Sequence, residues 1–322
     1  MKTPLFKTLR PIIDAAMTVL VIPAGWVMYG YRRIGSARLP MTTATLRRLG
    51  VFPLINHYYE PLFDPALLRE PLSTARTLPG IDFRLEEQLD TCKTLTRAGE
   101  FEAFVASEQQ RSDETAFRLD NDSFVSGDAD FLFQIIRQEK PGKIIEIGSG
   151  SSTKVAKHAL TLNAAEGSSV AEHICVEPFE QPWLERLGGI TVLRSKIEDC
   201  VIDWATALGP GDLLFIDSSH MIRPQGDVLY EYLTILPQLP AGVLVHVHDI
   251  FTPCDYLARW VEQDVKFWNE QYILEAVLGN STRYEIVAAL NLLKHTHFDA
   301  LKAVCPTLSE AHEPGSFYFR VK

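Results

Sequence analysis

The sequence lacks paired cysteines. Its five cysteines, at positions 92, 175, 200, 254 and 305, are an odd number and contain no CxxC pair. This argues against a disulfide framework and a zinc ribbon, and it fits a reducing compartment. Internal repeats and low-complexity tracts are also missing. With 46% hydrophobic and 22% charged residues, the chain is not collagen-like, mucin-like or largely disordered.

An excess of positive charge is missing too. The 322 residues include 31 Lys and Arg against 41 Asp and Glu, for a net charge of −10. No nucleic-acid partner is expected, because phosphate binding needs clustered positive charge. The charge is unevenly distributed: residues 1–50 carry eight basic residues and one acid, Asp14, so the rest of the chain is strongly acidic.

The basic beginning of the chain encloses an uncharged apolar run, residues 15–31. A helix that spans a bilayer needs about 20 apolar residues, and Pro23 and Gly25 would kink this one. Three interpretations stay open: an interfacial or re-entrant anchor on anionic lipid, a spanning helix, and an apolar helix docked on protein. Residues 1–38 are therefore expected to form a basic apolar segment. It could hold a cytoplasmic protein at the inner face of the membrane.

The remaining chain changes character near residue 120. Residues 39–120 look helical and irregular and are expected to form a cap or a dimer surface, whereas residues 121–322 alternate between strands and helices. Apolar runs predict strands at 143–147, 173–177, 190–194, 212–217, 242–249, 283–290 and 316–322. Helices are expected at 131–139, 152–162, 182–187, from Pro224 to about 239, and over most of 255–279. This order predicts an α/β domain with a doubly wound, mainly parallel seven-stranded sheet, helices on both faces and a helical N-terminal extension.

A glycine loop follows the first of these strands, at 146–153 (EIGSGSST). Gly148 and Gly150 allow a tight turn and the close approach of a ligand, and the hydroxyl residues after them can cap a helix whose N-terminus attracts an anion. A P-loop would need GxxxxGK[ST], which is absent, and a dinucleotide loop would need glycine where Thr153 stands. Glu177, which ends the next strand, can accept both hydroxyls of a ribose.

These features together resemble motifs I and II of class I S-adenosylmethionine-dependent methyltransferases. The stretches 215–253 and 268–278 are similar to the bacterial Methyltransf_24 family, which is related to catechol O-methyltransferase-like enzymes, and the resemblance covers about residues 120–320. It implies a Rossmann-like fold and S-adenosylmethionine as the cofactor, and it leaves the acceptor open. Ser152 stands in place of the third glycine of the common motif.

The resemblance also implies cofactor contacts. Glu146 and the glycines would line the methionine and ribose end, the serines of the loop would meet the carboxylate, and Glu177 would hold the ribose hydroxyls. Residues 124–128 fall where related enzymes close over the cofactor. The residues implied are Glu146, Gly148, Ser149, Gly150, Ser151, Ser152, Glu177, Ile197, Glu198 and Asp217.

A reaction centre is implied at the ends of the fourth and fifth strands. In metal-dependent relatives, acids there hold a Mg²⁺ that orients the acceptor oxygens, and the matching residues here are Asp217, His248 and Asp249. A histidine departs from the all-oxygen ligands that Mg²⁺ prefers, so Mn²⁺ and Fe²⁺ also stay open. His220, on the loop after Asp217, is a candidate general base, because imidazole titrates near pH 6.5. His248 is the other candidate base.

The sequence therefore predicts methyl transfer to a hydroxyl of a small-molecule, glycan or lipid-linked acceptor. A scaffold that binds S-adenosylmethionine without turnover is the first alternative. A non-haem iron oxygenase with His220, His248 and an aspartate as its metal triad is a second, and a nicotinamide-dependent dehydrogenase is a third. His295 and His297 are expected to be surface or packing residues, and a homodimer stays open.

Overall fold

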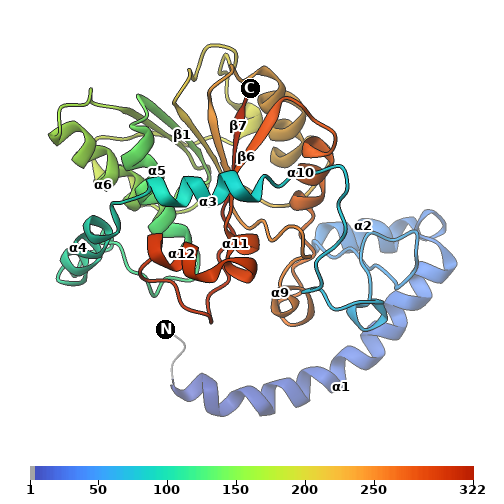
Figure 1. Cartoon of the computed structure of the whole chain (residues 1–322). Helices are drawn as coiled ribbons and strands as arrows, with labels where there is room; N and C mark the ends of the chain where they lie inside the picture. The colour runs from blue at the N-terminus through green and yellow to red at the C-terminus, as the bar shows by residue number, and fades with distance from the viewer. Residues whose placement is uncertain (1–3) are drawn as a thin grey trace. The chain divides into compact units, whose positions relative to one another are not determined.

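The computed structural model describes residues 4–322 (Figure 1). The chain divides into two compact units, residues 1–69 and residues 70–322. The first unit is mainly helical, and the second contains all seven strands of a single sheet.

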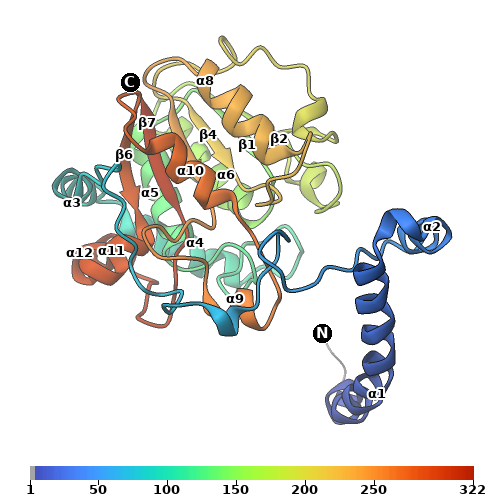
Figure 2. The ribbon, with the colours of Figure 1, turned by 90° about the vertical axis from the view of Figure 1, so that its right-hand side faces the viewer.

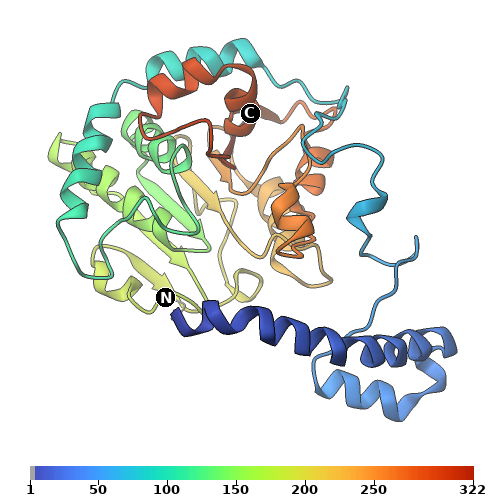
Figure 3. The ribbon, with the colours of Figure 1, turned by 90° about the horizontal axis from the view of Figure 1, so that it is seen from below.

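The first unit is dominated by one long helix, α1 (Pro4–Ile34), which runs through two internal prolines. Gly35, with a φ of 103°, ends it, and η1 (Ser36–Arg38) leads into α2 (Pro40–Arg48). The hydroxyl groups of Tyr31 and Thr43 lie 2.8 Å apart and join α2 to the end of α1. In Figure 3 the lighter blue α2 lies beside the end of the dark blue α1. The rest of the unit is irregular apart from η2 (Pro65–Leu67).

The sheet of the second unit has the strand order β3-β2-β1-β4-β5-β7-β6. Strand β7 is antiparallel to both of its neighbours, and the pairings among β1 to β5 are parallel. The predicted doubly wound, mainly parallel sheet of seven strands is therefore confirmed. The strands are β1 (Lys143–Ile147), β2 (Glu172–Val176), β3 (Thr191–Leu193), β4 (Leu213–Ile216), β5 (Leu244–Val247), β6 (Tyr284–Ala289) and β7 (Phe317–Val321).

Successive side chains of the buried strands enter two different cores, because side chains alternate between the faces of a sheet. Ile144 packs with one core and Ile145 with the other. In Figure 2, α8 and α10 lie on one side of the strands, and α5 and α6 lie on the other. The first core contains residues from α3 (Leu85–Thr94), α4 (Ala98–Gln109), α5 (Asp128–Glu139), α6 (Ser151–Ala165), α11 (Leu290–Thr296) and α12 (Phe298–Val304). The second contains residues from α7 (Asp227–Tyr230), the π-helical stretch η5 (Glu231–Ile235), α8 (Leu236–Gln238) and α10 (Glu270–Leu278).

Three predicted helices differ from the structure. The segment 182–187 forms only a short 3₁₀ turn, η3 (Leu184–Leu187). The helix expected from Pro224 begins at Asp227 instead, because this side chain accepts hydrogen bonds from the backbone and hydroxyl of Ser219. The helix expected over 255–279 is broken between α9 (Ala258–Glu262) and α10. Helices α11 and α12 were not predicted.

Candidate functional site

A cavity of about 500 Å³ opens at the carboxyl ends of β1, β2 and β4. Ligands of doubly wound sheets bind at this edge. Five of the predicted cofactor residues line the cavity: Gly148, Glu177, Ile197, Glu198 and Asp217. Its other lining residues are Ile147, Val176, Pro178, Phe179, Glu180, Lys196, Ser218, Ser219, Arg223 and Asp227.

The glycine loop passes very close to the end of β4. Gly148 has a φ of +76°, and a Cβ atom built on it would lie 1.7 Å from the carbonyl oxygen of Asp217. Only glycine fits there, since any side chain would meet backbone. The next helix begins at once, and the Gly150 N–H donates to the Thr153 hydroxyl over 3.0 Å. The backbone of the loop therefore forms part of the cavity wall.

Glu177 presents its carboxylate to the same cavity. The side chain is 8% exposed, and its Oε1 accepts hydrogen bonds from the backbone N–H groups of Phe179 and Glu180, at 3.0 and 2.9 Å. These two bonds hold the carboxylate in one orientation at the end of β2.

Glu146 lies beneath the glycine loop instead of on the cavity wall. Its carboxylate accepts a hydrogen bond from the Ser152 hydroxyl over 2.6 Å and lies 2.9 Å from His173 Nε2. A carboxylate this deeply buried needs such partners. Ser149 is also buried, and its hydroxyl faces the carbonyl oxygen of Glu146. Of the predicted loop contacts, Gly148 lines the cavity, whereas Glu146, Ser149, Gly150, Ser151 and Ser152 are not among its lining residues.

A second group of polar side chains gathers at the ends of β4 and β5. His248 Nδ1 lies 3.4 Å from Asp217 Oδ1 and 3.5 Å from Asp249 Oδ1. The ligand atoms of these three residues are close enough to hold one metal ion. His248 is 3% exposed, and neither of its ring nitrogens has a hydrogen-bond partner among the described residues. The structure thus brings together the three predicted metal ligands.

His220 joins this group from the loop after β4. Its Nε2 lies 3.3 Å from Asp217 Oδ1 and 3.5 Å from Asp249 Oδ2. Its Nδ1 lies 2.7 Å from Glu270 Oε2, and the other oxygen of Glu270 accepts a hydrogen bond from the Tyr232 hydroxyl over 3.0 Å. The rings of His220 and Trp268 are 4.4 Å apart. His220 is therefore held on one side by Glu270 and presents its other nitrogen to the two aspartates.

The backbone at this site is strained. His220 and Asp249 both have a φ of +58°, a backbone angle that residues other than glycine rarely adopt. Such strain persists only where the surroundings enforce it, and it is concentrated at functional sites. The backbone N–H groups of Asn269 and Glu270 donate to the carbonyl oxygen of His220 and hold its loop in this conformation.

Opposite charges dominate the titration of the cluster. Burial disfavours the charged form of Asp217, but the imidazoles of His248 and His220 outweigh it and hold the pKa of Asp217 well below its usual range. Burial also disfavours the charged form of His220, and by itself it would lower the pKa of this imidazole. Its hydrogen bonds with Asp217 and Glu270 overcome that effect and raise this pKa well above 6.5. The neighbouring carboxylates thus make the imidazole of His220 a stronger base than a free imidazole.

Three contributors to the site were not predicted from the sequence: Asp128, Glu270 and Tyr232. Asp128 Oδ2 lies 3.6 Å from His248 Nε2, and its Oδ1 accepts a hydrogen bond from the Ser316 N–H over 2.8 Å. Asp128 falls in the segment 124–128 expected near the cofactor, which was the one available signal. Glu270 and Tyr232 lie within apolar helical patterns and carry no local signal.

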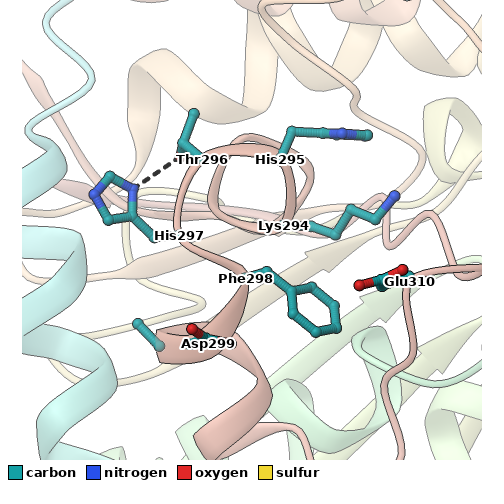
Figure 4. Close-up of a pocket in the computed structure, with 8 residues that line it drawn as sticks. Lys294, His295, Thr296, His297, Phe298, Asp299 and Glu310 are labelled. Atoms are coloured by element: carbon teal, nitrogen blue, oxygen red, sulfur yellow. Dashed lines mark hydrogen bonds between the residues drawn. The ribbon is translucent and has the colours of Figure 1, made fainter.

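A different cavity, of about 750 Å³, lies where α11 meets α12 (Figure 4). His295 and Lys294 both bond to Glu313, at 2.8 and 2.6 Å, and His297 bonds to the Thr296 hydroxyl. The cavity has no strand ends or glycine loop on its wall. Its lining residues are Lys294, His295, Thr296, His297, Phe298, Asp299, Ala300 and Glu310.

Comparisons with known proteins found one family match and several similar solved structures. Residues 145–250 match a methyltransferase domain, the Methyltransf_24 family. No curated protein matches the chain. An O-methyltransferase from Bacillus cereus in complex with S-adenosylhomocysteine is 16% identical, with a TM-score of 0.39, over 69% of this chain and 99% of that one. The O-methyltransferase TomG from Streptomyces achromogenes, involved in tomaymycin synthesis, is 15% identical, with a TM-score of 0.37, over 70% and 99%.

Proposed function

We propose, from the premise that this chain is a class I S-adenosylmethionine-dependent methyltransferase, that it methylates a hydroxyl oxygen of its acceptor. One observation carries the proposal. Asp217 lines the cavity at the glycine loop, and the same carboxylate lies 3.3 Å from the imidazole of His220. Asp217 therefore lies between the site expected for the methyl donor and His220, the expected proton acceptor. Methyl transfer to a hydroxyl requires these two sites to be adjacent.

The cavity fits S-adenosylmethionine. The close approach that Gly148 allows supports contact between the loop backbone and the ligand, and the fixed carboxylate of Glu177 is suited to the two ribose hydroxyls. Ile197 and Glu198, on the 3₁₀ turn η4 (Ile197–Asp199), would border the adenine. When bound, the sulfonium supplies an activated methyl group, so the protein has to align the acceptor oxygen and remove its proton.

His220 is proposed as the general base. Glu270 would accept a hydrogen bond from the Nδ1–H of His220 and so leave Nε2 free to take a proton. The same pairing stabilises the imidazolium that forms. Trp268 packs against the ring and restricts its rotation. Glu270 acts through His220 and is therefore a positioning residue.

A divalent metal fits the group formed by Asp217, His248 and Asp249. The unpartnered ring nitrogens of buried His248 and the two nearby carboxylates form a suitable donor set. A metal ion there would supply a Lewis acid that orients the acceptor oxygen and lowers the pKa of its hydroxyl group.

The long helix α1 supports membrane attachment. The stretch Leu9–Ile34 is long and apolar enough to cross a bilayer. Val19, Leu20, Val21 and Ile22 are each more than half exposed, and four consecutive residues point in four directions around a helix. An exposed apolar stretch of this length suits a bilayer better than water. Basic residues precede and follow the apolar stretch, which suits anionic headgroups.

This attachment favours a glycolipid or another lipid-linked molecule as the acceptor. The test is to incubate the full-length protein in vesicles with S-adenosylmethionine carrying a tritiated methyl group and with fractionated membrane lipids. Label is expected in the organic phase, and the matched variant His220→Gln should transfer at least about 100-fold more slowly. Label that appears only in water-soluble acceptors would overturn the lipid-linked acceptor. A folded protein that binds the cofactor and labels no acceptor of either kind would favour the scaffold.

A further inference from the structure

We propose that Asp217, His248 and Asp249 bind a first-row transition-metal dication, of the Mn²⁺ and Fe²⁺ class, in preference to Mg²⁺, and that His248 Nδ1 is a direct ligand. The inference rests on the proposed function for the metal's role in methyl transfer. The binding itself is a separate property, which can be measured without an acceptor.

The spacing of the ligand atoms suits a shared metal ion. His248 Nδ1 lies 3.4 and 3.5 Å from one oxygen of Asp217 and one of Asp249. Two atoms bonded to the same metal at about 2.0–2.2 Å lie roughly 3.0–3.5 Å apart. The observed distances are too long for good hydrogen bonds, yet they fall at the upper end of this range.

The second observation is that the imidazole of His248 is buried without hydrogen-bond partners in the described part of the chain. His248 is 3% exposed, and both of its ring nitrogens are without a hydrogen-bond partner among the residues that the structure describes. A buried polar atom left without a partner costs free energy. A metal ion between the two carboxylates would supply the partner that Nδ1 lacks.

The donor set decides which metal is preferred. Mg²⁺ is small and hard, takes oxygen ligands almost exclusively and is usually held through carboxylates and water. Imidazole nitrogen is a borderline donor that suits first-row transition metals, while the two carboxylates suit Mn²⁺ as well. One imidazole with two carboxylates therefore shifts selectivity away from Mg²⁺ and toward Mn²⁺ or Fe²⁺.

Asp128 is placed to position this ligand. Its Oδ2 lies 3.6 Å from His248 Nε2, and its Oδ1 is anchored by the backbone N–H of Ser316. A carboxylate that bonds to the second nitrogen of a metal-binding histidine leaves the first nitrogen free for the metal and makes it a better ligand, so we expect Asp128 to move within hydrogen-bond distance of Nε2 when the metal binds. Phe124 packs against the ring, with ring centres 5.0 Å apart. Asp128 is thus a positioning residue for the metal site.

His220 is the competing nitrogen donor, because its Nε2 also lies close to Asp217 and Asp249. Its Nδ1, however, already bonds to Glu270 at 2.7 Å, and the proposal gives it the role of base. The experiment must therefore tell the two imidazoles apart.

The decisive measurement is pulsed EPR on the full-length protein loaded with Mn²⁺. Electron spin echo modulation from a directly bonded ¹⁴N is expected in the wild type. It should be lost in His248→Glu, which keeps a ligand at that position, and retained in the matched variant His220→Gln. Loss of the modulation in His220→Gln with retention in His248→Glu would overturn the assignment, as would its absence from the wild type.

Metal selectivity gives the second readout. Calorimetric titration of the wild type should show Mn²⁺ binding at least about 100-fold more tightly than Mg²⁺, and His248→Glu should reduce that ratio about ten-fold or more by restoring oxygen ligands. Asp128→Asn should weaken Mn²⁺ binding about ten-fold. Equal affinity for Mg²⁺ and Mn²⁺ in the wild type would overturn the proposal. Titration of the same samples with S-adenosylhomocysteine tests the methyltransferase site separately. A failure of the metal proposal can therefore be told apart from a failure of the proposed function.

Discussion

The imidazole of His220 and the carboxylate of Glu270 lie 2.7 Å apart, although 50 residues separate them in the chain. Two further bonds hold this pair together, because the backbone N–H groups of Asn269 and Glu270 donate to the carbonyl oxygen of His220. The start of α10 is therefore fastened to the loop after β4. A side chain at the start of α10 thereby controls the orientation of the proposed base.

Glu270→Gln should remove the control of Glu270 over the orientation of the His220 imidazole. The amide cannot accept hydrogen bonds in the same way from both His220 and Tyr232, so the imidazole loses its fixed tautomer. We expect kcat for methyl transfer to fall about 100-fold, with KM and the affinity for S-adenosylhomocysteine nearly unchanged. The matched variant is Glu275→Gln on the same helix, which breaks a pair with Arg76 and should leave kcat within about two-fold, since Glu275 does not bond to His220. A kcat for Glu270→Gln within three-fold of wild type would contradict the positioning role.

Glu231→Gln should make the protein more stable at alkaline pH. Burial, and then the nearby charge of Glu270, raise the pKa of Glu231 well above 4.5. Between pH 4.5 and this raised pKa the native state holds a proton that the unfolded state has released, so Glu231 makes the free energy of unfolding fall as pH rises. The glutamine variant mimics the protonated acid and removes this dependence.

Urea denaturation of wild type and Glu231→Gln at pH 5.5 and pH 8 checks this prediction. The variant should gain stability relative to wild type between the two values, whereas the exposed control Glu102→Gln should show no such gain. A constant difference between variant and wild type would show that Glu231 keeps the same charge in the native and unfolded states.

Gly148→Ala should cost much more stability than Gly167→Ala. Both glycines have a positive φ, of +76° and +94°, so each alanine suffers backbone strain of about 1–2 kcal/mol. A Cβ at Gly148 also meets the carbonyl oxygen of Asp217, whereas nothing lies within 4 Å of one at Gly167. The steric term should add about 1–3 kcal/mol or more and abolish binding of S-adenosylhomocysteine. Equal unfolding free energies for the two variants would contradict the close approach of the loop.

Leu20→Arg should weaken membrane binding. An arginine at the centre of an apolar helix costs about 3 kcal/mol in a bilayer, or roughly 100-fold in partition. Leu233 offers a matched control, because it lies in the second unit and is equally exposed, at 62% against 63% for Leu20. In a vesicle flotation assay, the wild type and Leu233→Arg should float and Leu20→Arg should not. If all three remained unbound, α1 would not be an anchor.

Most of the sheet could be predicted from the sequence because its strands are short, apolar and separated by helices. The predicted strand 143–147 has the bounds of β1, and the six other predicted strands lie within two residues of those observed. Antiparallel β7 could not be placed, since strand order depends on contacts between distant segments.

The sequence predicted a helix wrongly where tertiary contacts override the local hydrophobic pattern. Residues 255–279 are apolar enough for one helix, but the chain breaks so that Trp268, Asn269 and Glu270 reach His220. The predicted contact of Glu146 with the cofactor stays a prediction, and the structure places its carboxylate beside His173 and Ser152. The positions of Glu177, Asp217, His248 and Asp249 followed from a simple rule, because the carboxyl ends of neighbouring parallel strands share one edge.

The most direct test of the methyltransferase site is calorimetric titration of the full-length protein with S-adenosylhomocysteine. We predict binding of one ligand per chain in the micromolar range, weakened at least about 20-fold in Glu177→Ala by loss of the carboxylate that would hold the ribose. The control Glu172→Ala, an exposed acid at the opposite end of β2, should bind as the wild type does. Absence of binding by the folded wild-type protein, or equal affinity in Glu177→Ala, would contradict the proposed cofactor site.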